Sequence, residues 1–140
     1  MKKIINVIWV LLILGAVLDG TQMRVKAGNL VYGDYEYSQN PSDKTISIIK
    51  YNGKDSEVEI PQKINGMNVV SISEEAFQFN DTIVDVVIPE GVTGIGSSAF
   101  SCCSNLKQVS FPDSLEKIGF TAFYNCESLE NIYIPENVNT

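Results

Sequence analysis

Apolar side chains recur along the chain at one constant spacing. The clearest series is an Ala-Phe pair that occurs three times, at Phe77, Phe100 and Phe123. Other apolar series with the same spacing are Ile72, Ile95 and Ile118; Val86, Val109 and Ile132; and Val92, Leu115 and Val138. A fixed period in the range of about 20–50 residues indicates a repeat protein. Because so short a unit cannot bury its own apolar side, stacked units must share one core, and the pattern predicts a solenoid.

One unit, residues 106–128, shows the elements that we expect in each repeat. Val109 and Phe111 alternate with polar residues as in a short strand, and Pro112, which has no backbone donor, ends that strand. A second apolar pair follows. The segment "TAFYNC", residues 121–126, then predicts one turn of helix or 3₁₀ structure that points its alanine and phenylalanine inward. The expected fold is therefore α/β, with short strands and one-turn helices in 23-residue repeats.

The two ends of the chain depart from the repeat. In residues 28–57, the segments "YGDYEYS" and "TISIIKY" alternate in polarity around the turn-forming "QNPSDK", which predicts a β-hairpin that caps the first repeat. Residues 58–140 hold the repeats, with a surface loop around Gly66 in the first. The last repeat is incomplete, which predicts exposed apolar surface and a strand edge. We expect either that the chain is a fragment or that this end is covered, for example by self-association.

Residues 1–27 have the layout of a secretory signal peptide. Lys2 and Lys3 precede an apolar run from Ile4 to Leu18, and Val25-Lys26-Ala27 follows with an apolar and a small residue at positions 25 and 27. The alternative is a transmembrane anchor, but this run is short for a membrane span, which needs about 20 apolar residues. We predict cleavage after residue 27, so that the remaining chain is secreted or displayed at the cell surface.

Charge and composition exclude several classes of function. Residues 1–27 hold four of the ten basic and one of the seventeen acidic residues, so residues 28–140 carry a net charge of −10. Such a chain repels phosphate backbones and anionic membranes, which argues against nucleic-acid or membrane partners. No histidine is present, which removes the commonest general base and metal ligand. The sequence predicts no cofactor, no metal site and no enzyme.

The three cysteines are the remaining candidates for chemistry. Cys103 and Cys126 occupy the same position of successive repeats, and Asn80 occupies that position in the first repeat. Parallel side chains on neighbouring coils suit a disulfide poorly, so we favour two small buried side chains. Cys102 has no cysteine equivalent, and as an odd cysteine it either pairs outside the chain or stays free. The redox state of all three stays open at this point.

The repeat resembles the BspA-type leucine-rich repeats. The segments "VVIPEGVTGIGSSAFSCCSNL" and "VSFPDSLEKIGFTAFYNCESL" carry this resemblance, through their strand-Pro, Ile-Gly, Ala-Phe and terminal-Cys positions. It implies a leucine-rich-repeat solenoid and a surface protein used in attachment to host matrix, host cells or other microbes. The alternative is a repeat region that spaces or delivers a catalytic or wall-binding domain absent from this chain.

The resemblance also nominates a partner-binding face, because leucine-rich-repeat proteins commonly bind partners on their strands. Residues that alternate with the inward ones should face outward in two columns along the stack. One column is Glu57, Asp85, Gln108 and Asn131, and the other is Glu59, Val87, Ser110 and Tyr133. The alternative interpretation is a set of merely solvated positions. Exposed Tyr and Val among acids and amides suit an extracellular protein or glycan partner.

Overall fold

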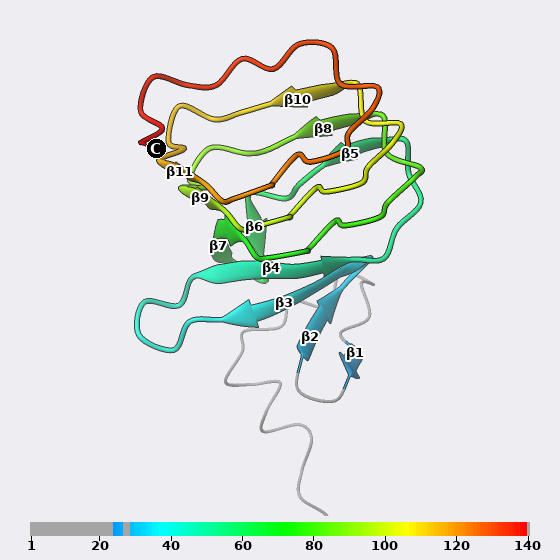
Figure 1. Ribbon diagram of the computed structural model, residues 1–140. Coiled ribbons are helices and arrows are strands. Elements are labelled where there is room, and N and C mark those ends of the chain that lie inside the picture. Colours follow the sequence, from blue (N-terminus) through cyan, green and yellow to red (C-terminus); the bar gives the residue numbers. More distant parts are fainter. Residues whose placement is uncertain (1–23, 27–28, 140) are drawn as a thin grey trace, which may run out of the picture.

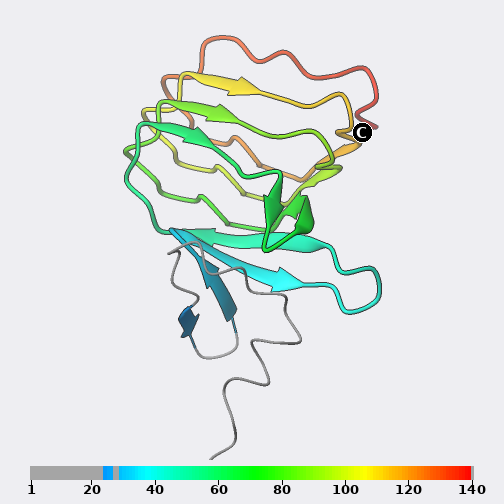
Figure 2. The same cartoon turned by 180° about the vertical axis from the view of Figure 1, so that it is seen from behind.

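The computed structural model describes residues 24–26 and 29–139. The predicted signal peptide lies outside the described residues except for positions 24–26, so its cleavage stays a prediction. The described chain winds into stacked coils, with the N-terminal strands at one end of the stack and the C-terminal coil at the other (Figures 1 and 2).

Within the described residues, the first three coils each contribute one strand to each of two sheets, and the last contributes a strand to the first sheet only. The first sheet stacks β4 (Ile46–Tyr51), β7 (Met67–Ile72), β9 (Gly94–Ile95) and β11 (Lys117–Ile118) in parallel. The second sheet stacks β5 (Glu57–Glu59), β8 (Asp85–Val87) and β10 (Gln108–Ser110), also in parallel. The register aligns Ile72 with Ile95 and Ile95 with Ile118, so the sequence repeat is also the spatial repeat.

The N-terminal strands form an antiparallel meander that continues the first sheet. It consists of β1 (Arg24–Lys26), β2 (Asn29–Tyr32) and β3 (Tyr35–Gln39), and β3 pairs with β4 across the turn at residues 40–45. The predicted hairpin strands are thus present. β4 has a second role, because its other edge pairs in parallel with β7 and places Ile48 beside Ile72. The strand therefore belongs to the hairpin and to the stack.

The loop that interrupts the first repeat is a small hairpin. β6 (Lys63–Ile64) pairs antiparallel with the start of β7, and Asn65 and Gly66 form the connection. Both connecting residues have positive φ angles, of 51° and 79°. Two such residues, and the sequence Asn-Gly, are typical of the tight turns that match the twist of a hairpin.

The one-turn helices predicted at the Ala-Phe segments are wrong, because the described residues contain no helix. Two turns in succession replace each expected helix. Along residues 97–103, the N–H groups of Ala99 and Ser101 bond three residues back, whereas those of Ser98, Phe100 and Cys102 bond to the next coil. Ser98 and Cys102 have left-handed φ angles of 53° and 60°. In a helix every N–H group lies along the helix axis and bonds within the helix, whereas in this segment every second N–H group bonds to the neighbouring coil.

The core contains a column of stacked aromatic rings. Phe77 and Phe100 are fully buried, and their ring centroids lie 4.7 Å apart. The column continues to Phe123 on one side at 5.3 Å and to Tyr51 on the other at 5.1 Å. Tyr35 from β3 adds a fifth ring, 5.0 Å from Tyr51. The column of aromatic rings therefore continues into β4 and β3, which precede the first Ala-Phe pair.

Candidate functional site

Cys103 and Cys126 hold neighbouring coils together as hydrogen-bond donors. The Cys103 thiol donates to the Phe77 carbonyl at 3.2 Å, and the Cys126 thiol donates to the Phe100 carbonyl at 3.1 Å. In the first repeat Asn80 fills the same position, and its side-chain amide donates to the Gly53 carbonyl at 3.3 Å. All three cysteines are free. The position therefore requires a small side chain with a donor, which explains why asparagine and cysteine exchange there.

Burial makes Cys103 a poor nucleophile. Loss of solvation, and secondarily the nearby Cys126, raises the pKa of the Cys103 thiol from 9.0 to about 12. Burial likewise raises the pKa of the Cys126 thiol. Since the unfolded chain ionises Cys103 near pH 9 and the folded chain keeps the proton until about pH 12, this thiol stabilises the fold fully below pH 9. That contribution is lost as the pH rises from about 9 to about 12.

Alkylation should distinguish the cysteines. With iodoacetamide at pH 8.5 we expect rapid modification of the partly exposed Cys102, slower modification of Cys126, and none of Cys103 until the chain unfolds, because only the thiolate reacts. Mass spectrometry of peptides from a time course measures each rate, and the same reaction in urea is the control in which all three should react. Equal native rates for Cys102 and Cys103 would contradict this assignment.

Cys102 occupies a backbone position that suits asparagine better. Its φ angle is 60°, and the equivalent residues Phe79 and Asn125 have φ angles of 59° and 57°. Asparagine tolerates this left-handed conformation, which costs most other residues about 1–2 kcal/mol. We expect Cys102→Asn to raise the free energy of unfolding by about 0.5–1 kcal/mol in urea denaturation. Cys102→Val is the matched control, and its β-branched side chain should lower the same free energy.

The residues nominated for the partner-binding face align as predicted over β5, β8 and β10. The register of the second sheet aligns Glu57, Asp85 and Gln108 in one row, and Glu59, Val87 and Ser110 in another. The residues between them, Val58, Val86 and Val109, point into the core and are buried. All six predicted residues line a hollow of about 350 Å³ on this face. Val87 is 43% exposed, so an apolar side chain lies among the polar ones.

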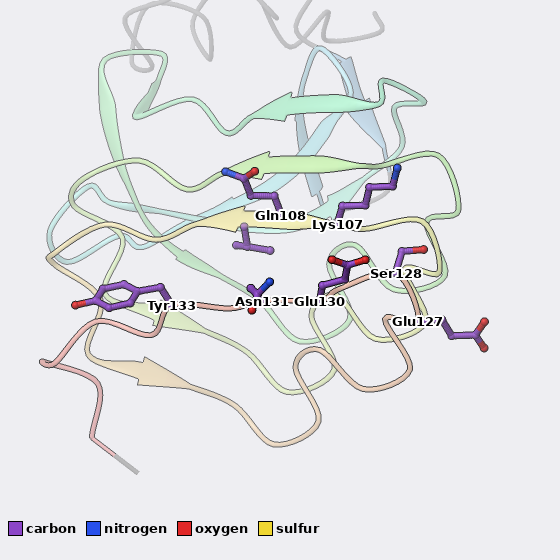
Figure 3. A pocket seen from close by; sticks show the side chains of 8 residues that line it. Lys107, Gln108, Glu127, Ser128, Glu130, Asn131 and Tyr133 are labelled. Atoms are coloured by element: carbon purple, nitrogen blue, oxygen red, sulfur yellow. The ribbon is translucent and has the colours of Figure 1, made fainter.

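The fourth row differs from the prediction. Within the described residues, β10 pairs only with β8, and residues 131–133 form no strand beside it. Asn131 and Tyr133 instead line a second hollow of about 580 Å³ between β10 and the segment of residues 127–133 (Figure 3). Gln108 lines both hollows, so the two adjoin. Tyr133 is 80% exposed.

The second hollow contains charged residues that sequence reasoning did not select. Lys107 precedes β10, and Glu127, Ser128 and Glu130 come from the turn that leads to the last segment. None of these positions belongs to the two outward columns, which is why the strand pattern missed them. The face as a whole has carboxylates in its first two rows, and its later rows combine two further carboxylates with amides, hydroxyls, a lysine and a tyrosine ring.

The comparisons with known proteins identify the repeat. A family model for the BspA-type leucine-rich repeat region matches residues 49–140, with six copies. The chain belongs to this family. The match includes the end of β4, in agreement with the place of that strand in the stack. Among curated proteins, no match is found.

Crystal structures of bacterial leucine-rich-repeat proteins are similar to this BspA-type chain. The leucine-rich repeat protein of T. pallidum is 34% identical over 75% of this chain and 49% of its own, with a TM-score of 0.73. A leucine-rich repeat protein from Bacteroides capillosus is 28% identical over 79% of this chain and 84% of its own, with a TM-score of 0.72. A leucine-rich cell surface protein from Faecalibacterium prausnitzii is 31% identical over 77% of this chain and 31% of its own, with a TM-score of 0.69. The chain thus spans about half of the length of the T. pallidum protein and about a third of the length of the Faecalibacterium prausnitzii protein.

Neither a metal centre nor a membrane helix appears in the part of the BspA-type chain that the structure describes. No group of three or more acidic, cysteine or histidine side chains there could hold a metal ion. The same residues include no helix long and apolar enough to cross a membrane. The candidate site is the pair of adjoining hollows, one on the second sheet and one beside β10.

Proposed function

We propose that this chain is a non-catalytic extracellular binding module that contacts a protein partner through the face of β5, β8 and β10. The observation that carries the proposal is the gathering of all eight nominated residues on two adjoining hollows, one on the sheet of β5, β8 and β10 and one beside β10. Val87 and Tyr133 supply exposed apolar area there, and the surrounding acids and amides supply hydrogen-bonding groups. Tyrosine and apolar anchors surrounded by polar groups are typical of protein interfaces.

We place the module at the cell surface or outside the cell. The signal-peptide pattern of residues 1–27 supports export, and one similar structure is named as a cell surface protein. The strongly acidic composition of residues 28–140 argues against nucleic acid and anionic membrane as partners. In this proposal the N-terminal strands serve as the cap, because β3 covers the outer edge of β4 and β2 and β1 continue the sheet beyond β3.

A repeat region that spaces or delivers another domain is the second candidate. The observation in its favour is length, since two of the similar structures are two to three times longer than the part that this chain matches. The two candidates differ in what the isolated chain does, because a spacer needs no partner of its own.

Binding to purified extracellular-matrix proteins tests the proposal. The chain and a variant with Asp85→Lys and Tyr133→Ala are compared by biolayer interferometry, with a glycan array as the second arm. We expect at least a tenfold weaker affinity for the variant, because central aromatic and charged positions dominate such interfaces. Glu116→Lys, an exposed charge reversal outside both hollows, is the matched control and should bind as the parent does. Equal binding by all three chains would refute the face, and binding only to glycans would refute a protein partner.

A further inference from the structure

The outer edge of β5 is an unpaired strand edge beside the proposed binding face. β5 ends the second sheet on the side of the N-terminal strands (Figure 1), and within the described residues it pairs with β8 alone. In a parallel ladder, alternate residues of a strand bond to the same neighbour. The Ile60 N–H donates to the Val87 carbonyl at 3.0 Å, and the Ser56 carbonyl accepts from β8 at the other end of the strand. The backbone groups of Glu57 and Glu59 therefore point away from β8.

Tyr35 marks the direction of this edge. Its hydroxyl donates to the Glu59 carbonyl at 3.4 Å, which is long for a bond between two oxygen atoms. In the described chain, no backbone hydrogen bond joins the N–H group of Glu57 or Glu59 to any segment other than β8. An unpaired edge is a template for an added strand, and addition of a strand to such an edge is a common mode of peptide recognition.

Carboxylate side chains gather at the same edge. Glu57 and Glu59 are exposed on β5, and Asp85 on β8 lies in register with Glu57. None of these three carboxylates forms a hydrogen bond or an ion pair within the described residues. The described residues that line the hollow beside them include no lysine or arginine. The strand edge therefore presents uncompensated negative charge to a partner.

The surroundings of Tyr35 add to this charge. Burial, and secondarily the neighbouring Tyr51, Asp34 and Asp55, raises the pKa of the Tyr35 hydroxyl above its ordinary value of 10.0. Because this hydroxyl also contacts the Glu59 carbonyl, the two aspartates lie near the same edge. Carboxylates from β5, from the turn before β3 and from the residues before β5 thus act on one place. Such a field attracts cations and repels anions.

We propose that the outer edge of β5 binds an extended segment of the protein partner that carries lysine or arginine at alternate positions. The inference rests on the proposed function, and it adds the mode of binding and the charge of the partner. The segment joins the second sheet as a further strand and exchanges main-chain bonds with Glu57 and Glu59. Side chains alternate along a strand, so every second residue of the segment stands beside these glutamates on the outward face. Opposite charges in such cross-strand pairs stabilise a sheet.

The same charges argue against a second copy of the chain at this edge. Two copies of β5 laid edge to edge would oppose glutamates to glutamates on the outward face, which is destabilising. β5 has only three residues, so few main-chain bonds are available to offset that repulsion. A basic segment gains from the main-chain bonds and from the charges together. Pairing between two copies at β5 is therefore a competing outcome of the test.

A synthetic peptide of alternating lysine and threonine, added to the full chain, tests the proposal. We expect it to slow amide hydrogen exchange of Glu57 and Glu59 roughly tenfold, because new main-chain bonds protect these groups. Two control peptides keep its composition and charge. One carries the lysines in a single block, and the other has N-methyl groups on its internal amides and so has no main-chain donors there. Both should bind at least about tenfold more weakly, because each lacks one requirement of strand addition.

Charge reversal on the chain tests the choice of a basic segment. Glu57→Lys with Glu59→Lys should weaken binding of the alternating peptide at least about tenfold, because like charges then face each other across the strands. Glu116→Lys with Glu136→Lys is the matched control. It changes the net charge by the same amount at two exposed positions outside both hollows, and it should bind the peptide as the parent chain does.

Four results would overturn the inference. They are unchanged exchange at Glu57 and Glu59, equal binding of either control peptide, equal weakening by both pairs of substitutions, and protection of the same amides in a dimer without peptide. Competition separates the inference from the proposed function. A matrix protein that is sensitive to Asp85→Lys and Tyr133→Ala, but is not displaced by the alternating peptide, would refute the strand edge and leave the proposed function intact. Protection by the peptide without binding to any matrix protein would support the edge and count against the proposed function.

Discussion

Phe100→Ala is expected to lower the free energy of unfolding by about 3–5 kcal/mol, the usual cost of removing a buried phenylalanine. Phe100 is fully buried and lies between Phe77 and Phe123 in the aromatic column, with ring centroids 4.7 Å and 5.3 Å away. Truncation opens a cavity between two rings that belong to different coils. Because each coil contacts only its neighbours, this cavity weakens both interfaces of the coil that contains Phe100.

Urea denaturation followed by circular dichroism measures this effect. Phe79→Ala is the matched control, since the same change is made two residues after Phe77 on a side chain that is 69% exposed. We expect the control to shift the free energy of unfolding by no more than about 0.5 kcal/mol, as is usual for surface substitutions. A loss of similar size in both variants would show that the ring column does not hold the coils together.

The sequence predicted the repeat and the register of the sheets because both depend on side-chain spacing. Residues such as Val86 and Val109 can be buried together only if their strands align, and the structure aligns them. The outward rows of β5, β8 and β10 follow from the same alternation. The first six nominated positions could therefore be placed without coordinates.

Two features of the structure could not be predicted from the spacing of side chains in the sequence. The Ala-Phe turns look helical in sequence, but their backbone donors are shared with the next coil, and only coordinates show where an N–H points. The last row failed for a different reason. Ile132 keeps the apolar pattern of a strand, yet in the described chain residues 131–133 do not pair with β10, and no coil packs on their other side.

Tyr51 shows a third limit. It occupies the aromatic column beside Phe77 at 5.1 Å, but the sequence interval from Tyr51 to Phe77 is longer than the interval from Phe77 to Phe100. The spacing changes because β4 runs straight from Ile46 to Tyr51, where later coils insert a turn. A search at fixed spacing therefore missed a member of the core that belongs to the same column.

The recurring glycines have a physical reason that only the structure reveals. A side chain on Gly96 would place its Cβ 2.6 Å from the Ser73 carbonyl carbon, and the backbone N and Cα of Glu74 are also too close. Gly119 has the same relation to the backbone of Gly96 and Ser97. Ser73 holds this position in the first repeat and carries a side chain, since the coil before it has a straight strand and no turn at that place.

Gly96→Ala should therefore separate two coils and lower the free energy of unfolding by about 3 kcal/mol, the upper end of the range for overpacking, because the obstructing atoms are backbone and cannot rotate away. Gly94→Ala is the matched control two residues earlier. Its added Cβ would meet no atom within 4 Å, and alanine loses less conformational entropy than glycine on folding, so this variant should gain about 0.5 kcal/mol. Urea denaturation of both variants measures the difference. Equal stabilities would mean that the coils can move apart at this contact without cost, and the close approach would then not explain why glycine recurs there.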